Sequence, residues 1–185
     1  IESITQTNSI FDDDNSNAEL TNSTQTSIEL TPKTTQAMIT PALPLNCSQM
    51  LQDKMNIREP TLVQTRFWNI VPEAIPPPTH TCEVVAATGS GKTFAFLCPL
   101  ATPVYNKHAL IVSPTRELAR QTGETATKLG LSVGVLIGGV SSYLQREQHG
   151  KRITVGTPRR LLASYPLFGL VQVLVCDEAD RLLDA

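Results

Sequence analysis

Residues 86–93 are Ala86-Ala87-Thr88-Gly89-Ser90-Gly91-Lys92-Thr93, and they join a short apolar run to a helix-like stretch. Glycine adopts backbone angles that other residues avoid, so Gly89 and Gly91 allow successive amide N–H groups to point into one concavity. A helix beginning at Lys92 adds the partial positive charge of its N-terminus. The pattern predicts a phosphate-binding loop with Lys92 on phosphate oxygens and Thr93 on Mg²⁺; the alternative is a glycine-rich turn with a solvated lysine.

A second, acidic motif directly follows the apolar run 171–176 and consists of Asp177-Glu178-Ala179-Asp180. A carboxylate at a strand tip beside a phosphate-binding loop is placed to hold the metal ion of a nucleotide. We expect Asp177 to bind Mg²⁺ through a coordinated water and Glu178 to orient or deprotonate the attacking water. The alternative is an acidic turn that caps a helix at 181–183. Both motifs in this order on one sheet favour a nucleotide hydrolase.

Short apolar runs alternate with helix-like stretches along the rest of the chain. The runs are 84–87, 109–112, 132–137, 153–155 and 171–176, and the helix-like stretches are 92–99, 116–129, 141–149 and 158–163. Unbroken runs of Val, Ile and Leu are typical of strands covered on both faces, and helices between them indicate a parallel sheet. We therefore expect a three-layer α/β/α fold with ligands at the carboxyl ends of its strands.

Two further helices are expected before this alternation. Apolar side chains predict one within 43–55, and Thr61 is a suitable N-cap for a second, which Pro72 and then Pro76-Pro77-Pro78 should end. Phe67 and Trp68 on this second helix fit a core position better than a stacking platform for nucleic acid. The histidines are scattered and form no metal set: His80, His108 and His149.

The first 45 residues have a different composition from the rest. Twenty-one of them are Ser, Thr, Asn or Gln, and six acidic residues against one basic residue give them a charge of −5, whereas residues 46–185 carry +3. Such a segment buries too little apolar surface to offset the entropy lost on ordering. We expect residues 1–42 to be disordered and the domain to span residues 43–185.

Several classes of protein are excluded by simple observations. No apolar run approaches the ~18 residues that a membrane helix needs, so we expect no membrane partner. No signal peptide or Arg-rich transit peptide is visible, and we expect an intracellular protein, in the nucleus, nucleolus or cytoplasm. The four cysteines lack metal-ligand or redox spacing, and Cys82, Cys98 and Cys176 lie in apolar runs, which predicts buried thiols.

The loop and the acidic motif together resemble the ATP-binding motifs of DEAD-box RNA helicases. Other signatures of that family appear in order along the chain: Pro60–Gln64 resembles the Q motif, Pro114–Ala119 matches motif Ia, Gly138-Gly139 matches the double glycine, and Thr157–Arg160 resembles the Thr-Pro-Gly-Arg motif. The resemblance spans about residues 43–185. It implies the N-terminal RecA-like domain of a P-loop NTPase, with ATP and Mg²⁺ as cofactors and RNA as the partner.

The resemblance also implies roles for individual residues. Gln64 would pair with adenine, because its amide carries both a donor and an acceptor and guanine presents the reverse pattern. RNA contacts would position the strand without reading sequence, and the alternative for the arginines is a salt bridge or solvent. The implied ATP-binding residues are Gln64, Thr88, Gly89, Ser90, Gly91, Lys92 and Thr93; the RNA-binding residues are Pro114, Thr115, Arg116, Gly138, Gly139, Thr157 and Arg160; Asp180 would couple the two domains.

The chain departs from the family pattern at a few positions. Ala86 and Arg159 stand where the family has glycines, and Ile57 stands where it usually has an aromatic residue. The Ser-Ala-Thr motif and the second RecA-like domain do not follow Asp180. We therefore expect the incomplete N-terminal half of a helicase that couples ATP hydrolysis to local RNA unwinding, with one sheet edge exposed.

The sequence leaves two rival functions to consider. One is a catalytically inactive single domain that binds nucleotide or RNA. The other is a different P-loop class, but the guanine motif of GTPases and the Leu-Ser-Gly-Gly-Gln signature of transporter ATPases are both absent from the sequence.

Overall fold

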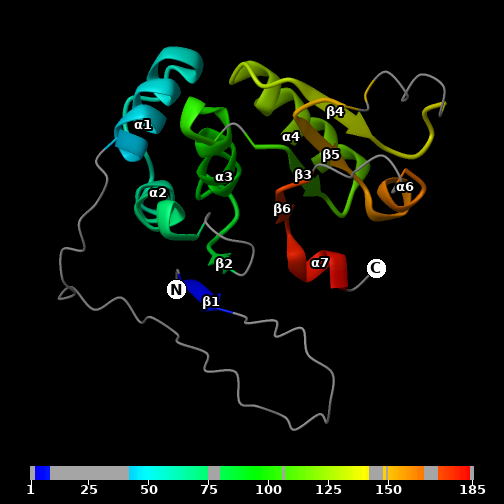
Figure 1. Ribbon diagram of the computed structural model, residues 1–185, viewed down its shortest axis with the longest axis horizontal. Coiled ribbons are helices and arrows are strands. Elements are labelled where there is room, and N and C mark those ends of the chain that lie inside the picture. Colours follow the sequence, from blue (N-terminus) through cyan, green and yellow to red (C-terminus); the bar gives the residue numbers. More distant parts are fainter. Residues whose placement is uncertain are drawn as a thin grey trace, which may run out of the picture.

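The computed structural model describes residues 3–8, 42–74, 80–105, 107–141, 148, 150–164 and 171–183. The strands are β1 (Ser3–Asn8), β2 (His80–Val85), β3 (Ala109–Val112), β4 (Val133–Leu136), β5 (Ile153–Gly156) and β6 (Val173–Cys176). The helices are α1 (Ala42–Met55), α2 (Leu62–Ala74), α3 (Lys92–Ala101), α4 (Arg116–Lys128), α6 (Pro158–Leu162) and α7 (Ala179–Leu183), with a short 3₁₀ helix at Pro103–Tyr105 (Figure 1). The helix predicted at 141–149 lies almost entirely outside the described residues.

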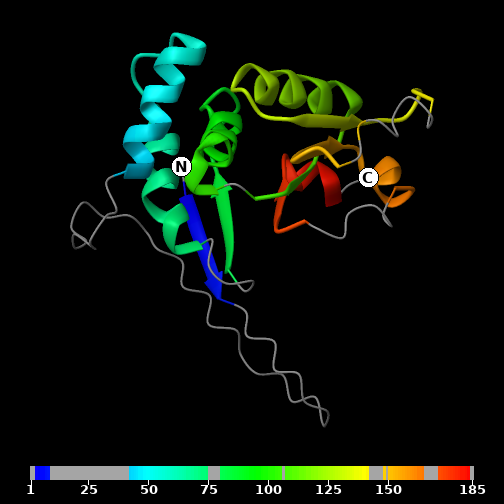
Figure 2. The same cartoon turned by 45° about the horizontal axis from the view of Figure 1, so that its top comes forward.

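Four strands form a parallel sheet in the order β4-β5-β3-β6. Ala109 pairs with Ile153 on one side and with Val173 on the other, so β3 and β5 are central strands. Their buried side chains, among them Ile111, Ile153 and Val155, explain why their sequence is apolar without alternation. The predicted parallel sheet with helices packed on it is confirmed, and α4 runs along β4 and β5 (Figure 2).

The strand that precedes the glycine-rich loop does not pair with this sheet, so the prediction that the run 84–87 belongs to the parallel sheet is wrong. Instead β2 pairs antiparallel with β1, Ser3 opposite Val85 and Asn8 opposite His80. The expectation of disorder throughout residues 1–42 is therefore wrong for Ser3–Asn8, and the rest of that segment lies outside the described residues. Main-chain hydrogen bonds to a free strand edge need no apolar side chains, and the β-branched Ile4, Thr5 and Thr7 favour an extended backbone.

A group of helices packs beside β2 and carries much of the core. Trp68 of α2 is fully buried, and its Nε1–H donates to the carbonyl of Ala95 in α3 at 3.0 Å. Leu51 of α1 and Leu97 of α3 belong to the same buried cluster. Figure 1 shows α1, α2 and α3 together next to β2, and the core position predicted for Trp68 is confirmed.

Three smaller predictions need correction or comment. Helix α2 continues through Pro72 to Ala74, because a proline near the last turn removes only one intrahelical hydrogen bond. Cys176 is exposed rather than buried, since β6 is an edge strand on which Leu174 is 63% exposed. Strand β6 is therefore the exposed edge of the sheet that the sequence analysis expected. Within the described part of the chain, no helix is long and apolar enough to cross a membrane.

Candidate functional site

The glycine-rich loop connects the end of β2 to the start of α3. Gly89 and Gly91 have φ angles of +80° and +94°, which are the left-handed conformations that the sequence predicted for them. The amide of Ser90 donates to the carbonyl of Ala87 at 3.2 Å and closes a tight turn. A Cβ added at Gly89 would meet no atom within 4 Å, so the backbone of the loop borders open space at the helix N-terminus.

Lys92 folds back onto this loop. Its Nζ donates to the carbonyl of Ala86 at 2.6 Å and to that of Ala87 at 2.9 Å. An ammonium group has three N–H donors, so the loop itself takes two of them. The third donor remains for a phosphate oxygen, and further contacts from Lys92 to a phosphate would replace one of these carbonyls.

Gln64 lies against the same loop from α2. Its Nε2 donates to the carbonyl of Gly91 at 3.1 Å, and its Oε1 accepts from the amide of Thr61 at 2.9 Å. The hydroxyl of Thr61 in turn accepts from the Gln64 amide at 3.4 Å, which completes a reciprocal capping box. The N-cap role predicted for Thr61 is confirmed. The Thr-x-x-Gln spacing is the sequence signal for this arrangement, but nothing in the sequence indicated that Gln64 also holds Gly91.

Asp177 directly follows β6, 85 positions after Lys92 in the sequence, and its side chain is buried. Burial raises the pKa of Asp177 above its ordinary value, and the Glu178 carboxylate raises it further. The Lys92 ammonium, the Glu178 amide and the Thr122 hydroxyl act in the opposite direction. The charge of the loop lysine therefore favours the ionised form of Asp177.

Glu178 adopts an unusual conformation beside Asp177. Its φ angle is +50°, which is rare and costly for a residue with a side chain and tends to occur at functional sites. Its carboxylate forms an ion pair with Arg181 at 3.1 Å. In the present arrangement this carboxylate is therefore engaged by α7.

The RNA-contact residues implied by the sequence form a second group. The Arg116 guanidinium lies against the double glycine, since a Cβ would lie 3.1 Å from it at Gly138 and 3.0 Å from it at Gly139. Gly139 also has a φ angle of +84°. Arg160 of α6 donates to the carbonyl of Val140 at 3.2 Å. The structure thus brings three separate motifs together around residues 138–140.

The remaining predicted residues occupy loop ends and helix starts. Thr115 caps α4 by accepting from the Leu118 amide at 3.1 Å, whereas Thr157 begins α6 without a side-chain cap. Ser90 Oγ is buried with no hydrogen-bond partner, and Asp180 is exposed in the first turn of α7. Further residues of the two groups are Thr88, which is exposed, and Thr93 and Pro114, which are half-buried.

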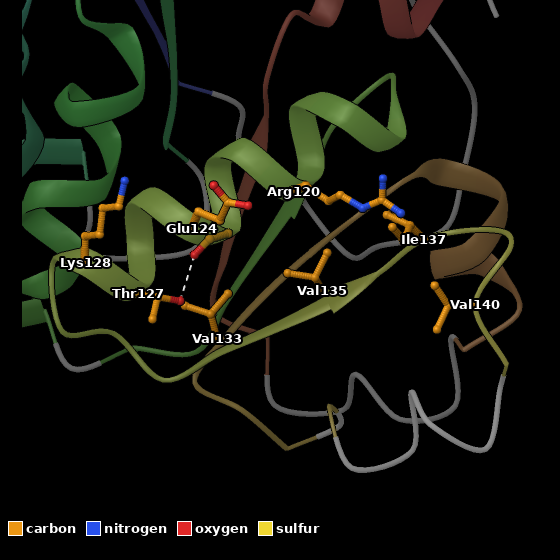
Figure 3. Close-up of a pocket in the computed structure, with 9 residues that line it drawn as sticks. Arg120, Glu124, Thr127, Lys128, Val133, Val135, Ile137 and Val140 are labelled. Atoms are coloured by element: carbon orange, nitrogen blue, oxygen red, sulfur yellow. Dashed lines mark hydrogen bonds between the residues drawn. The ribbon is translucent and has the colours of Figure 1, made fainter.

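A pocket of about 580 Å³ lies elsewhere, between α4 and β4 (Figure 3). Its floor is apolar, from Val133, Val135 and Ile137, and its rim is charged, from Arg120, Glu124 and Lys128. None of the residues predicted from the sequence lines it. Among the described residues, no group of three or more His, Cys, Asp or Glu side chains could hold a metal ion.

The fold and the loop define a class, the nucleotide-binding α/β domains with a phosphate-binding loop between a strand and a helix. The DEAD/DEAH box helicase family matches residues 61–185, and the chain belongs to this family. The resemblance deduced from the motifs is thereby confirmed.

Individual relatives agree with this assignment. The chain is 37% identical over 176 residues to the ATP-dependent RNA helicase HCA4 of Saccharomyces cerevisiae, covering 84% of the chain and 22% of that protein. It is 46% identical over 118 residues to the ATP-dependent RNA helicase dbp4 of Aspergillus oryzae, covering 54% of the chain and 15% of that protein. The matched part of the chain thus spans only 22% and 15% of the length of these two relatives.

Solved structures show the same fold. The RNA helicase Prp28 from Chaetomium thermophilum, bound to ADP, is 33% identical with a TM-score of 0.60, over 77% of this chain and 38% of that one. A hypothetical ATP-dependent RNA helicase from Sulfolobus tokodaii is 26% identical with a TM-score of 0.63, over 76% of this chain and 43% of that one. The RecA-like parallel-sheet fold expected from the sequence is confirmed.

Proposed function

We propose that the chain binds ATP with Mg²⁺ and that the protein to which it belongs couples ATP hydrolysis to RNA binding and local unwinding. The observation that carries this proposal is the geometry of the glycine-rich loop at the start of α3, where Gly89 and Gly91 have positive φ angles and Lys92 folds back on the loop. In the DEAD/DEAH box helicase family to which the chain belongs, this loop and the acidic motif would divide a nucleotide's triphosphate and its metal ion between them.

The residues present suit a magnesium ion. Mg²⁺ prefers hard oxygen ligands and keeps several waters, and the site offers the Thr93 hydroxyl and the Asp177 carboxylate. The Oδ2 atom of Asp177 is buried without a hydrogen-bond partner, which leaves it a lone acceptor. Thr93 and Asp177 would hold the ion, which neutralises charge on the phosphates when bound. Glu178 would orient the attacking water once its carboxylate leaves Arg181.

Adenine recognition by Gln64 requires a local rearrangement. The side chain is only 2% exposed, and both of its polar atoms already have partners at Thr61 and Gly91. We propose that a bound nucleotide moves the loop away from α2 far enough to free the amide. Because Gln64 touches Gly91, the base site and the phosphate site would then change together.

RNA is proposed to bind over the cluster around the double glycine. Arg116 is exposed and carries a positive charge next to two glycines that leave room for a backbone, and Arg160 lies on the same cluster. The hydroxyls of Thr115 and Thr157 and the surface at Pro114 extend it. Contacts of this kind reach phosphates and sugars, so binding should be independent of sequence.

A second candidate function is nucleotide and RNA binding without catalysis. The ion pair between Glu178 and Arg181 favours it, because a carboxylate engaged at 3.1 Å is less available to a water molecule. This chain alone would then act as a binding domain.

The test of nucleotide binding is a titration with a fluorescent ATP analogue in the presence of Mg²⁺. Removing the ammonium in Lys92→Ala should abolish binding, while Lys54→Ala, which removes an exposed lysine of α1, should leave it unchanged. Equal affinity of Lys92→Ala and the parent chain would refute the proposed site. ATP turnover measured with and without RNA then separates the catalytic function from the binding function.

A further inference from the structure

Arg159, the second residue of α6, borders the cluster around the double glycine that is proposed to bind RNA. The next residue, Arg160, donates to the carbonyl of Val140 at 3.2 Å and so attaches α6 to the loop 138–140. A trans peptide bond keeps the Cα atoms of the two arginines about 3.8 Å apart. Arg159 is therefore anchored one residue away from a contact of this cluster, although the family pattern has glycine at its position.

Helix α6 is fixed to the end of the sheet by main-chain and apolar contacts. It follows directly after β5 (Figure 1). The amide of Thr157, at its start, donates to the carbonyl of Leu136 in β4 at 3.2 Å. Leu161 is only 5% exposed, and a Cβ added at Gly156 would lie 2.8 Å from its Cδ2 atom. The backbone that carries Arg159 is thus held in a defined place beside β4 and β5.

The two arginines of α6 are engaged differently. Arg160 is half-buried, and its guanidinium is bound to the carbonyl of Val140. Arg159 is exposed, and its side chain forms no hydrogen bond or ion pair with any residue that the structure describes. A cation without an acidic partner can neutralise a phosphate and release the counterion that accompanied it. Arg159 is therefore the cation of α6 that can bind a phosphate without breaking a contact within the protein.

We propose that Arg159 is a further RNA-binding residue of this chain and that it contacts a phosphate next to the one contacted by Arg116. The inference rests on the proposed binding of RNA over residues 138–140. Arg116 lies against Gly138 and Gly139, and α6 is attached at the following residue, so an RNA backbone that crosses this loop meets both arginines. A guanidinium forms strong, charge-assisted hydrogen bonds with phosphate oxygens. Glycine at this position could not make the contact, so the contact is a property of this chain and not of the family pattern.

The opposing explanation is that Arg159 is a solvated surface residue that attracts RNA only through the net charge of the chain. Variants of the full chain separate the two explanations. Arg159→Ala removes the side chain, whereas Arg159→Lys keeps the charge. Arg58→Ala is the matched control, since it removes the same charge from an exposed arginine between α1 and α2. Arg116→Ala reports on the RNA cluster itself.

The experiment measures the affinity for fluorescein-labelled poly(U) and poly(A) between 50 and 200 mM salt by fluorescence anisotropy, together with the melting temperature without RNA. We expect the slope of log K against log salt to be about 0.7 less steep in Arg159→Ala, which corresponds to an affinity loss of about eightfold at 50 mM and about threefold at 200 mM salt. Arg159→Lys and Arg58→Ala should keep the parent slope. The melting temperature should not change, because an exposed side chain without partners adds little stability.

Three results would overturn the inference. Arg159→Ala could keep the slope of the parent chain, or Arg58→Ala could lose as much as Arg159→Ala, which would make the effect one of net charge. A loss that lysine does not restore, accompanied by a lower melting temperature, would make Arg159 a structural residue of α6. If the parent chain does not bind RNA, or if Arg116→Ala binds it as the parent does, the proposed RNA site is wrong instead, so the two failures are distinguishable.

Discussion

The side-chain amide of Gln64 donates to the carbonyl of Gly91, 27 residues away, at 3.1 Å. One end of this contact is the capping box of α2 and the other is the turn that leads into α3. The helix cap and the phosphate-binding loop are therefore one hydrogen-bonded unit. A Cβ at Gly91 would lie 2.4 Å from Gln64 Nε2, so the contact also requires glycine at this position.

Gln64→Ala should destabilise the chain by about 2–3 kcal/mol, because it removes a helix cap and leaves the Thr61 amide and the Gly91 carbonyl without a partner. Urea unfolding followed by circular dichroism measures this change. Gln49→Ala is the control, since Gln49 makes an exposed hydrogen bond to Asp53 within α1 that is worth about 0.5 kcal/mol or less. Equal losses in the two variants would contradict the role given to Gln64.

Gly91→Ala should cost both stability and nucleotide affinity. The φ angle of +94° is strained for alanine, and the added methyl group collides with Gln64. The double variant Gly91→Ala/Gln64→Ala removes the collision but keeps the strain. We expect it to be less destabilised than the sum of the two single variants, and strict additivity in urea unfolding would show that the residues do not interact.

The sequence predicted most of the fold because its signals are local. The apolar run 109–112 predicted strand β3 with the bounds that the structure shows, Ala109–Val112. Thr115, directly before α4, caps that helix. The pairing of β2 with Ser3–Asn8 was missed, because it depends on main-chain hydrogen bonds between distant and largely polar segments. The exposure of Cys176 was missed for a related reason, since an apolar run does not reveal that its strand is at an edge.

The sequence predicted the individual motifs of the candidate site, but it did not predict the side-chain contacts between them. The loop glycines and the acidic motif each have a recognisable sequence pattern, and each follows directly after a strand, β2 for the loop and β6 for the acidic motif. The contact of Gln64 with Gly91 has no such pattern, because it arises from how α2 packs against the loop, which no single stretch of sequence specifies.

Asp177→Asn should stabilise the chain in the absence of Mg²⁺, and the gain should grow with pH. Because burial raises the pKa of Asp177 above its unfolded value, the folded state holds the proton more tightly than the unfolded state. The carboxyl therefore costs no stability well below pH 4, where it is protonated in both states; the cost grows as pH rises from the unfolded pKa of about 4 to the higher folded pKa and is constant above it.

Urea unfolding of Asp177→Asn and the parent chain at pH 4 and pH 7 tests this dependence. Glu59→Gln serves as the control, because Glu59 is exposed in the segment between α1 and α2. A stability difference that shrinks from pH 4 to pH 7 would show that Asp177 is favoured as the charged form in the folded chain, contrary to expectation.

The four thiols should react in an order set by burial. Cys176 is exposed, whereas burial raises the pKa of Cys82 to about 11 and that of Cys98 to about 12, and it raises the pKa of Cys47 with a further contribution from Cys98. The thiolate is the reactive form. At pH 8 a thiol reagent should modify one cysteine quickly, and this fast phase should vanish in Cys176→Ser. Fast modification of Cys47 or Cys98 in the folded chain would contradict the packing of α1 on α3.

Arg116→Ala should weaken RNA binding equally for different sequences and reduce its salt dependence. The guanidinium is exposed beside Gly138 and Gly139, where it can contact a phosphate. A contact to a phosphate does not distinguish one base from another. Each phosphate contact on a single strand contributes about −0.7 to the slope of log K against log salt, so four contacts give a slope near −3. Removing one arginine should make the slope about 0.7 less steep on poly(U) and poly(A) alike, whereas Lys54→Ala on α1 should leave it unchanged. A loss confined to one of the two homopolymers would mean that Arg116 reads bases, and the proposed backbone-only contact would then be wrong.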